Sequence, residues 1–266
     1  MTTKQTAAAI LVFSFFFLFL HNTKTLSESK PLPSLPFEEI KLEAKSAYVF
    51  DITRNKEVFK LNADAPLPLA SLTKIMTAVV ALENIPQGQK LTDLLSIMLI
   101  SSSNDVATEL SLGVELPSSL GSSTPFVSLM NKKAEELDLG QTVFLNPTGL
   151  DISPDIAGAH GSAKDVFKLM DYFIKNYQEI AKITGYESII VNSHIFKNTD
   201  KLTEQLPGIV AGKTGFSDLA GGNLAVIIDI GLGHPVAIIV LGSTEEGRFE
   251  DVKKLYKATF KTLTSQ

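Results

Sequence analysis

Ser71 and Lys74 form the pattern S-x-x-K at the start of an apolar stretch with helical period. Residues three apart on a helix lie on one face, so the lysine amine can reach the serine hydroxyl. A serine hydroxyl is a weak nucleophile until a base takes its proton. A desolvated lysine near other cations loses proton affinity and can serve as that base. The spacing therefore predicts a serine nucleophile with a lysine base, at a helix N-terminus that favours negative charge on an attacked carbonyl oxygen.

Two further motifs could complete such a site. Ser102-Ser103-Asn104 interrupts two helical stretches, where polar side chains can face a cleft. Lys213-Thr214-Gly215 is the only K-T-G in the chain, and we expect it on a strand. There Lys213 and Gly215 would point to one face and Thr214 to the other. A glycine in a strand also lets a ligand backbone approach closely.

Each motif has an ordinary structural explanation when it is taken alone. Ser71 could be a helix N-cap followed by a surface lysine, and S-x-x-K recurs at Ser27–Lys30 in a polar stretch. The serine cluster could cap two helices, and K-T-G could end a strand in a turn. Together, the three occur in the order S-x-x-K, S-x-N, K-T-G on a helix start, an interhelical loop and a strand. This order and these contexts favour serine acyl-transfer chemistry.

The composition excludes several other functions. The 266 residues carry a net charge of −5 and only two arginines, Arg54 and Arg248, so no basic surface is expected for nucleic acid. Cysteine is absent, which excludes disulfides, thiolate zinc sites and a cysteine nucleophile. With four histidines and no HExxH motif, a histidine-rich metal site is not expected either. We therefore expect neither a metal nor a cofactor.

The elements that would position the motifs follow an α+β pattern. Strands are expected at Ala47–Ile52 and Glu57–Leu61 near the start and at Asn223–Ile230 and Pro235–Leu241 near the end, the last two forming a hairpin. Helices are expected from Leu72, from Thr92-Asp93, over Val106–Leu112, from an N-cap at Thr124 to Gly140, from a capping box at Ser162 and Asp165, and over about Arg248–Thr262, with a turn at Asn146–Gly149. This predicts an antiparallel β-sheet flanked by helices, with an all-α lobe inserted between its strands.

The N-terminus has the pattern of a targeting segment. Lys4 precedes an unbroken apolar run, Ala7–Leu20, whose 14 residues are short for a membrane span. The run suits the apolar core of a secretory signal, although no clean A-x-A cleavage site follows it. We expect residues 1–22 to be a signal peptide or an N-terminal membrane anchor, residues 23–40 a linker, and 41–264 the functional domain. The protein would then work outside the cytoplasm, in the periplasm or at the cell surface.

Beyond the three motifs, the chain resembles the penicillin-recognising D-alanyl-D-alanine carboxypeptidases, the low-molecular-mass penicillin-binding proteins. The matching segments are Ala47–Asp51, Ala70–Thr77, Met98–Asp105, Phe144–Leu150, Gly212–Phe216 with Ala220-Gly221, and Leu241–Ser243 followed by Arg248. The resemblance covers about residues 40–262. It implies a β-lactamase/transpeptidase-like fold and a serine D,D-peptidase domain.

The resemblance implies a catalytic role for three residues. Ser71 would be the nucleophile, Lys74 its base, and Ser102 the relay that carries a proton to the leaving D-alanine. Asn104 would bind the peptide backbone of the substrate.

The same resemblance assigns the K-T-G segment to substrate binding. Lys213 and Thr214 would hold the terminal carboxylate of the substrate, and Arg248 would add positive charge for the same group. The strand at Gly215 would lie close to the ligand. The backbone N–H of Phe216, with that of the nucleophile, would form the oxyanion hole.

The implied activity is removal of the terminal D-alanine from peptidoglycan stem peptides that end in D-Ala-D-Ala, through an acyl-enzyme on Ser71. β-Lactams would acylate the same serine as covalent inhibitors and leave slowly. Attachment to a membrane would come from the N-terminal apolar segment.

One spacing departs from the family pattern. Only 31 residues separate Ser71 from Ser102, fewer than is usual, and the shortfall lies between about Asn84 and Gln89. A hairpin or loop bordering the cleft is therefore expected to be missing. That shortening bears on how the substrate is positioned more than on the chemistry.

Three alternatives stay open. A D,D-endopeptidase that cuts peptidoglycan cross-links would use the same residues. A class A β-lactamase should carry a glutamate-bearing loop, whereas Glu135-Glu136-Leu137 falls in a predicted helix. A non-catalytic, wall-binding relative would keep the fold, but all the motif side chains are present.

Overall fold

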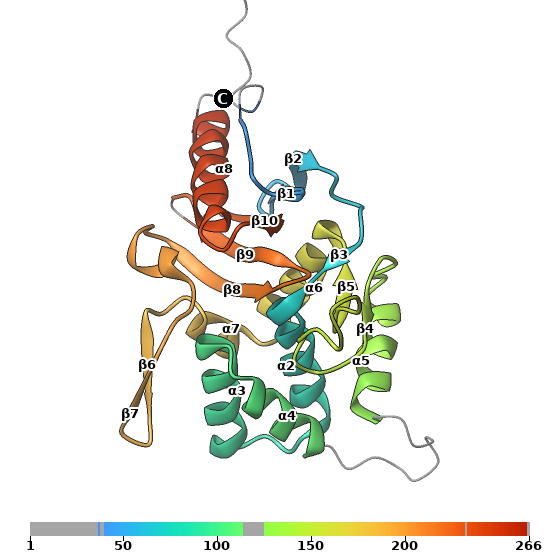
Figure 1. The fold of residues 1–266 in the computed structure, drawn as a ribbon. Helices are drawn as coiled ribbons and strands as arrows, with labels where there is room; N and C mark the ends of the chain where they lie inside the picture. The colour runs from blue at the N-terminus through green and yellow to red at the C-terminus, as the bar shows by residue number, and fades with distance from the viewer. Residues whose placement is uncertain (1–36, 38–39, 114–124, 232, 265–266) are drawn as a thin grey trace, which may run out of the picture. The chain divides into compact units, whose positions relative to one another are not determined.

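A five-stranded antiparallel sheet pairs the early strands of the chain with the late ones (Figure 1). The computed structural model describes residues 37, 40–113, 125–231 and 233–264. The strand order is β2-β1-β10-β9-β8. The strands are β1 (Ser46–Asp51), β2 (Lys56–Leu61), β8 (Ile209–Ser217), β9 (Gly221–Asp229) and β10 (Pro235–Ser243). Everything between β2 and β8 is therefore an insertion into this sheet, as predicted.

The insertion is mainly helical. Its helices are α2 (Thr73–Asn84), α3 (Gln89–Ser101), α4 (Asn104–Leu112), α5 (Pro125–Glu136), α6 (Ala163–Asn176) and α7 (Gln178–Ile183), with the 3-10 turns η1 (Ala70–Leu72) and η2 (Lys201–Glu204). It also holds a small sheet of β3 (Leu67–Pro68), β5 (Ala159–Gly161) and β4 (Val143–Phe144), and a hairpin of β6 (Ser188–Val191) and β7 (His194–Lys197). The sequence did not predict these short strands or α7.

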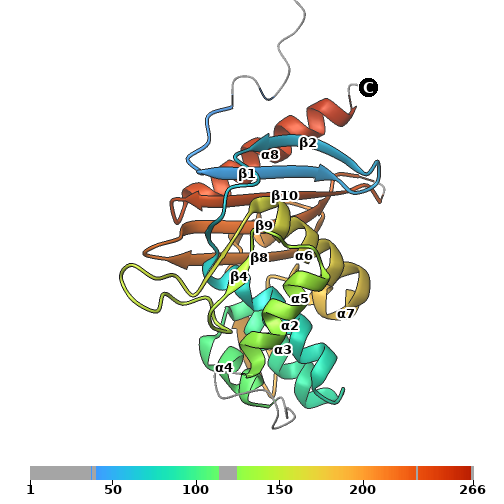
Figure 2. The same cartoon turned by 90° about the vertical axis from the view of Figure 1, so that its right-hand side faces the viewer.

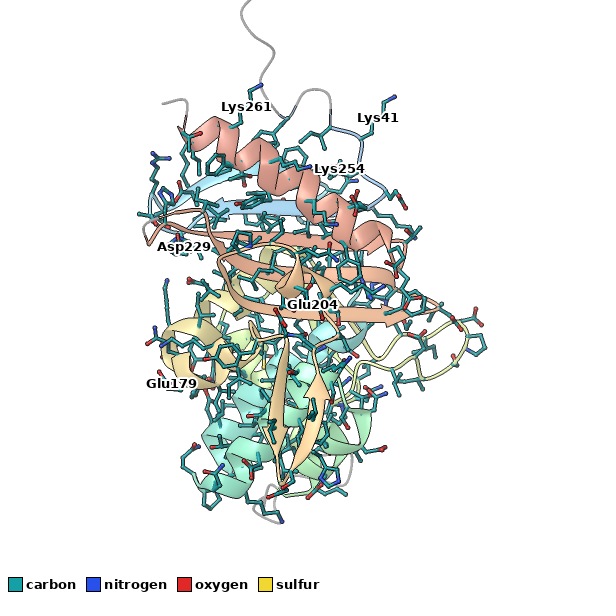
Figure 3. The ribbon with its side chains drawn as sticks, turned by 90° about the vertical axis from the view of Figure 1, so that its left-hand side faces the viewer. Lys41, Glu179, Glu204, Asp229, Lys254 and Lys261 are labelled. Carbon is teal, nitrogen blue, oxygen red and sulfur yellow. The ribbon has the colours of Figure 1, made fainter. Side chains whose placement is uncertain are left out.

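Helices cover both faces of the large sheet (Figure 2). The last helix, α8 (Gly247–Thr264), crosses the outer face and carries Lys254 and Lys261 on its exposed side (Figure 3). It packs on alternate residues such as Val226 and Ile238, while their neighbours Ile227 and Ile239 pack against the insertion. Because both faces are buried, β9 and β10 are nearly continuous apolar runs.

Helix α2 runs through the middle of the insertion. Nine consecutive residues, Thr73–Ala81, are buried, as expected for a helix that is surrounded by protein. It contacts α3, α4, α5 and α6, and the turn η1 at its start contacts β8 and β9. The start of α2 is therefore held at the point where the helical insertion meets the sheet.

The start of α3 differs from the prediction. Thr92 and Asp93 were expected to open this helix, but it begins at Gln89. The backbone N–H and the hydroxyl of Thr92 both donate to the carbonyl of Gly88, at 3.1 and 3.3 Å. Thr92 therefore lies inside the first turn and is not an N-cap. Only four residues, 85–88, connect α2 to α3, at the position of the predicted shortening.

The end of α5 also differs from the prediction. The helix was expected to end at Gly140 but ends at Glu136. Asp138 takes the left-handed conformation, with φ 53°, and the Leu139 N–H donates to the carbonyl of Ala134 at 2.9 Å. This conformation and this hydrogen bond end the helix as a glycine after the last turn commonly does. Aspartate is one of the few other residues that tolerate this conformation.

The other predicted elements that fall in the described ranges are present. Ser162 caps α6 by accepting a hydrogen bond from the Asp165 N–H at 3.1 Å, and K-T-G lies on β8. The predicted cap at Thr124, the predicted leader 1–22 and nearly all of the predicted linker 23–40 lie outside the described residues. Within the described ranges, no helix combines the length and apolarity that a membrane span requires.

Asp251 joins three parts of the chain on the outer side of the sheet. Its fully buried carboxylate accepts hydrogen bonds from the Glu43 N–H at 3.1 Å, the Ala44 N–H at 2.9 Å and the Ser243 hydroxyl at 2.8 Å. Glu43 and Ala44 lie in the segment before β1, and Ser243 is the last residue of β10. Asp251 itself lies on α8. The carboxylate thus fixes α8 to the central strand β10 and to the segment that leads into β1.

We expect Asp251→Asn to lower the free energy of unfolding by about 2–3 kcal/mol, because the amide nitrogen would face donors that the carboxylate now satisfies. Urea denaturation of the full chain measures this change. Glu250→Gln is the matched control: Glu250 is exposed and, among the described residues, its side chain bonds Lys253 alone, so its replacement should cost less than about 0.5 kcal/mol. Equal losses in the two variants would contradict the assigned role.

Candidate active site

Ser71 lies in the 3-10 turn η1, which continues directly into α2. The Lys74 Nζ is 2.8 Å from the Ser71 Oγ, as the S-x-x-K spacing predicts. Lys74 lies in the first turn of α2, and residues three apart are neighbours on a helix surface, which brings the two side chains together. The 3-10 turn begins at Ala70 with φ 46°, a left-handed conformation that residues other than glycine seldom adopt. Backbone strain is therefore stored beside the candidate nucleophile.

Lys74 is fully buried and surrounded by oxygen atoms. Besides the Ser71 hydroxyl, its Nζ contacts the Asn104 Oδ1 and the Thr148 carbonyl oxygen, both at 2.7 Å. No carboxylate is among these partners. Burial lowers the pKa of Lys74 from 10.5 to about 7, because the charged amine is removed from water without an opposite charge.

The partners of Lys74 also fix the direction of its lone pair. The Asn104 Oδ1 and the Thr148 carbonyl can only accept hydrogen bonds. A neutral amine has two hydrogens and one lone pair, so these two acceptors take both hydrogens. The lone pair is then left for the Ser71 hydroxyl, the one partner that can also donate. The geometry therefore suits removal of a proton from Ser71.

The serine cluster divides into a cap and two residues that contact the buried lysines. Ser103 is the N-cap of α4, and its hydroxyl accepts from the Val106 N–H at 3.3 Å. Ser102 takes a left-handed conformation, with φ 59°, between α3 and α4. Its hydroxyl accepts a hydrogen bond from the Lys213 Nζ at 2.8 Å. The chain reversal thus turns Ser102 and Asn104 toward the two lysines.

Lys213 connects the second motif to the third. It is 2% exposed, and its Nζ donates to the Ser102 hydroxyl and to the Thr214 carbonyl at 2.9 Å. Burial, together with the nearby charges of Lys74 and Arg248, lowers the pKa of Lys213 well below its usual value. The structure therefore brings all three predicted motifs into one cluster.

Gly215 permits the close approach of β8 to the nucleophile turn. A Cβ at this position would lie 2.8 Å from the Leu69 carbonyl oxygen and 3.2 Å from the Ser71 nitrogen. Such contacts are too short, so only glycine fits without movement of the backbone. Phe216 follows on the strand with 45% of its surface exposed. The Thr214 hydroxyl lies 2.5 Å from that of Thr199.

Arg248 lies at the start of α8 beside the end of β8. It is 6% exposed, its Nη1 donates to the Gly215 carbonyl at 2.8 Å, and its guanidinium lies over the Phe249 ring. It is therefore a buried cation beside the candidate site. Its contact with Gly215 places it next to the K-T-G segment, where the sequence predicted it.

Two groups near the motif cluster, the Thr148 carbonyl and the Asp200 carboxyl, were not predicted from the sequence. The turn Asn146–Gly149 was predicted, but not that the carbonyl of Thr148 would bind Lys74. The Asn146 Oδ1 accepts from the N–H groups of Thr148 and Gly149 at 3.1 and 2.7 Å, which shapes this turn. Asp200, buried behind β8, was also missed. Neither carries a motif signal, because one acts through its backbone and the other depends on tertiary burial.

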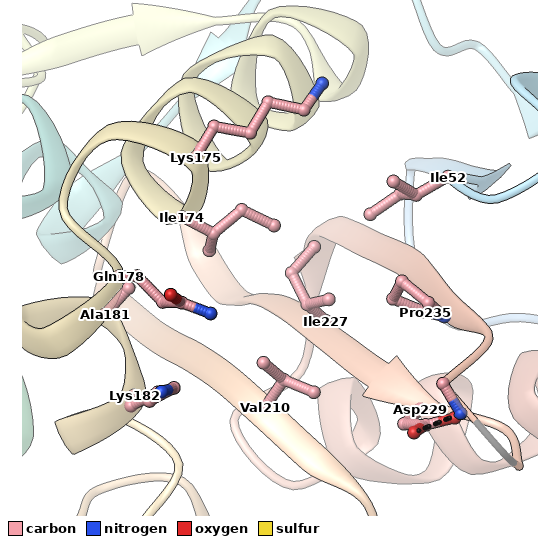
Figure 4. Close-up of a pocket in the computed structure, with 11 residues that line it drawn as sticks. Ile52, Ile174, Lys175, Gln178, Ala181, Lys182, Val210, Ile227, Asp229 and Pro235 are labelled. Carbon is pink, nitrogen blue, oxygen red and sulfur yellow. Dashed lines mark hydrogen bonds between the residues drawn. The ribbon is translucent and has the colours of Figure 1, made fainter.

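Other features lie apart from this cluster. A cavity of about 460 Å³ lies between α6, α7 and the opposite end of β9, with Ile174, Val210 and Ile227 among its walls (Figure 4). Glu136, one of the two glutamates considered above for the β-lactamase alternative, lies on helix α5 and forms an ion pair with Lys133 at 2.6 Å. Among the described residues, no group of three or more His, Asp or Glu side chains could hold a metal ion.

The sequence matches the model of one peptidase family, described as D-alanyl-D-alanine carboxypeptidase, over residues 85–245. The chain belongs to this family. The matched region contains Ser102, Asn104 and the K-T-G motif, while Ser71 and Lys74 precede it. The predicted family is thereby confirmed.

Family relatives include both kinds of D,D-peptidase. The chain is 29% identical to D-alanyl-D-alanine carboxypeptidase DacF of Bacillus subtilis, over 84% of this chain and 63% of that protein. It is 30% identical to the D-alanyl-D-alanine endopeptidase of Escherichia coli, over 74% of this chain and 70% of that protein. The chain thus spans somewhat less than two thirds of the length of the Bacillus carboxypeptidase.

Solved structures confirm the predicted fold class. Penicillin-binding protein D2 from Listeria monocytogenes, in its cefotaxime-bound form, superposes with a TM-score of 0.72 at 27% identity, covering 83% of this chain and 98% of that one. A variant of the Streptomyces K15 DD-transpeptidase shares the fold with a TM-score of 0.71 at 21% identity, covering 84% and 99%.

We expect Gly149→Ala to damage the site through the backbone. Gly149 has φ 79°, and a Cβ there would lie 1.9 Å from the Ala70 carbonyl oxygen, so the turn that presents Thr148 to Lys74 must move. The free energy of unfolding should fall by about 3 kcal/mol in urea denaturation. Gly140→Ala is the matched control, since a Cβ there meets nothing within 4 Å. A tolerated Gly149→Ala would show that the turn is not fixed.

Proposed function

We propose that this chain hydrolyses the peptide bond between two D-alanines at the end of a peptidoglycan stem peptide, through an acyl-enzyme on Ser71. The observation that carries the proposal is the position of Lys74. A buried amine with a pKa of about 7 lies 2.8 Å from the serine hydroxyl, and its other partners accept both of its hydrogens. This arrangement supplies the base that a serine nucleophile needs.

The proposed reaction has two steps. The Ser71 Oγ attacks the carbonyl carbon of the penultimate D-alanine while its proton passes to Lys74. The backbone N–H groups of Ser71 and Phe216 stabilise the negative oxygen. The C–N bond then breaks, and the leaving nitrogen takes a proton relayed through Ser102. In the second step water attacks the ester carbonyl and gives a proton to Lys74. The bond between the acyl carbon and the Ser71 Oγ then breaks, and the Oγ takes that proton from Lys74, which releases the shortened peptide and restores the free serine.

The proposed substrate contacts follow from the groups that face the cluster. Lys213 and Thr214 would bind the terminal carboxylate, and Arg248 would add positive charge from behind Gly215. Asn104 gives its Oδ1 to Lys74, which leaves its amide nitrogen to donate to a substrate carbonyl. We assign no role to a metal or a cofactor.

A solved relative supports one further part of the proposal. The Listeria penicillin-binding protein D2 was solved in cefotaxime-bound and ampicillin-bound forms, so we infer that β-lactams acylate Ser71 here as well. The peptidoglycan substrate and the predicted N-terminal leader or anchor favour work outside the cytoplasm, secreted or attached to the membrane. The catalytic domain would extend over residues 41–264.

A second candidate function is cleavage of peptidoglycan cross-links. It is favoured by the 30% identity to the Escherichia coli D-alanyl-D-alanine endopeptidase. The same nucleophile and base would act, and only the leaving group would differ. Cross-linked muropeptides are therefore tested beside the linear peptide.

We expect the full-length chain to release D-alanine from diacetyl-Lys-D-Ala-D-Ala, and Ser71→Ala to lower the rate by roughly a thousandfold or more. An assay of free D-alanine measures the rate, and labelling by a fluorescent penicillin reports acylation. Ser103→Ala is the control, because this neighbouring motif serine caps a helix and should remain active. Penicillin labelling without D-alanine release would favour the endopeptidase. Loss of both would leave a wall-binding relative.

We expect kcat/KM to rise with pH through about 7. Lys74 must be neutral to act as a base, and its folded pKa lies near 7, so below that value the rate should fall about tenfold per pH unit. Lys74→Arg, which stays charged at all these values, should be inactive throughout. A rate that is flat between pH 5.5 and 8.5 would contradict Lys74 as the base.

A further inference from the structure

Asp200 places a carboxyl group behind the K-T-G strand. It is 1% exposed, and its Oδ1 accepts from the Leu202 N–H at 2.9 Å, which caps η2. Its Oδ2 is buried and has no hydrogen-bond partner within the described ranges. A buried polar atom without a partner is costly. The position of this oxygen therefore calls for a reason other than capping.

The carboxyl group rests directly against the backbone of β8. A Cβ on Gly212 would lie 2.7 Å from the Asp200 Oδ2, so the absence of a side chain at 212 makes room for it. Successive residues of a strand point to opposite faces. Lys213 therefore extends from the front of the strand, toward Ser102, while Asp200 lies at its back.

The segment that carries Asp200 is itself tied to the site. The preceding residue, Thr199, donates its N–H to the carbonyl of Ile100 at 3.1 Å, two residues before Ser102. Its hydroxyl is hydrogen-bonded to that of Thr214. Asp200 is thus held at a fixed position relative to both the S-x-N loop and the K-T-G strand.

The charges around this position are unbalanced. Lys74, Lys213 and Arg248 are buried, and none forms an ion pair within 4.0 Å in the described part of the chain. Three groups act on Lys213: the charge of Lys74, which lies on α2, the charge of Arg248, which lies on α8, and the hydroxyl of Ser102 at the end of α3. Asp200 interacts electrostatically with Arg248 and, across the strand, with Lys213, and Arg248 also interacts with Glu245 and Glu246. Asp200 is the acidic group that acts on Lys213.

We propose that Asp200 is a positioning residue that keeps Lys213 protonated through the backbone of β8, so that the site is cationic before a substrate carboxylate arrives. The inference rests on the proposed function and deepens it, because it makes Asp200 a determinant of selectivity for peptides with a free terminal carboxylate. Asp200 does not touch the substrate. It acts through the charge of Lys213.

This role has a pH signature. Burial raises the pKa of Asp200 to about 6, although the Leu202 N–H, Arg248 and Lys213 oppose the rise. The carboxyl group is therefore ionised at pH 8 and mostly neutral at pH 5. Removal of its charge should matter at pH 8 and make little difference at pH 5, which a purely structural role would not produce.

The test compares full-length wild type with Asp200→Asn, which keeps the shape and an oxygen for the Leu202 cap. The matched control is Glu204→Gln, the same change of charge at an exposed position of the same turn (Figure 3). Each is assayed at pH 5 and pH 8 with diacetyl-Lys-D-Ala-D-Ala and with its C-terminal amide. At pH 8 we expect Asp200→Asn to lower the acid-to-amide ratio of kcat/KM about tenfold, mainly through KM, and Glu204→Gln to match wild type.

Equal losses on the acid and the amide, or the same loss at pH 5 and pH 8, would overturn the inference. If the wild type is active and Asp200→Asn behaves like Glu204→Gln, the inference fails and the proposed function stands. If the wild type cleaves neither peptide, the proposed function fails, and the same pH comparison is made on acylation by benzylpenicillin, which also carries a carboxylate. If Asp200→Asn does not fold, Gly212→Ala, which displaces the carboxyl group, must give the same pattern.

Discussion

The site depends on the burial of one lysine among oxygen atoms that carry no charge. Lys74 could be satisfied more easily by a carboxylate, but such a partner would hold its proton and remove its use as a base. Neutral acceptors from two other segments, Asn104 and Thr148, satisfy the amine without fixing the charge. The surrounded helix α2, the strained turn at Ala70 and the glycine at 149 all serve to keep these groups in contact.

The large sheet brings together residues that lie far apart in the sequence. It places Lys213, on a late strand, close to the turn that carries Ser71. Strand β8 lies at one side of the sheet and contacts the turn η1 through Gly215. Lys213 then reaches Ser102, and Arg248 supports the strand from α8. Asp251 fixes α8 itself to the sheet. The geometry of the motif cluster thus depends on packing on the far side of the sheet.

Much of this could be predicted from the sequence, because the motif residues sit on elements with clear periods. The pair Ser71 and Lys74 follows from helical spacing, and the long strands β9 and β10 follow from continuous apolar runs. The short strands β3, β4 and β5 span only two or three residues, too few for a period. Thr148 acts through its backbone carbonyl, which any residue type has, and the position of Asp200 depends on tertiary burial. Neither role can be predicted from composition or spacing.

The order of the strands also determines when the site can exist. Ser46 pairs with Leu241, and Lys213 comes 142 residues after Ser71, so the nucleophile is synthesised long before the strand that completes its surroundings. Contacts between such distant segments form late and slowly in folding. A ribosome-bound chain that has not yet reached β8 therefore holds Ser71 and Lys74 without Lys213 beside them. The proposed reaction would therefore have to wait until the C-terminal hairpin completes the sheet.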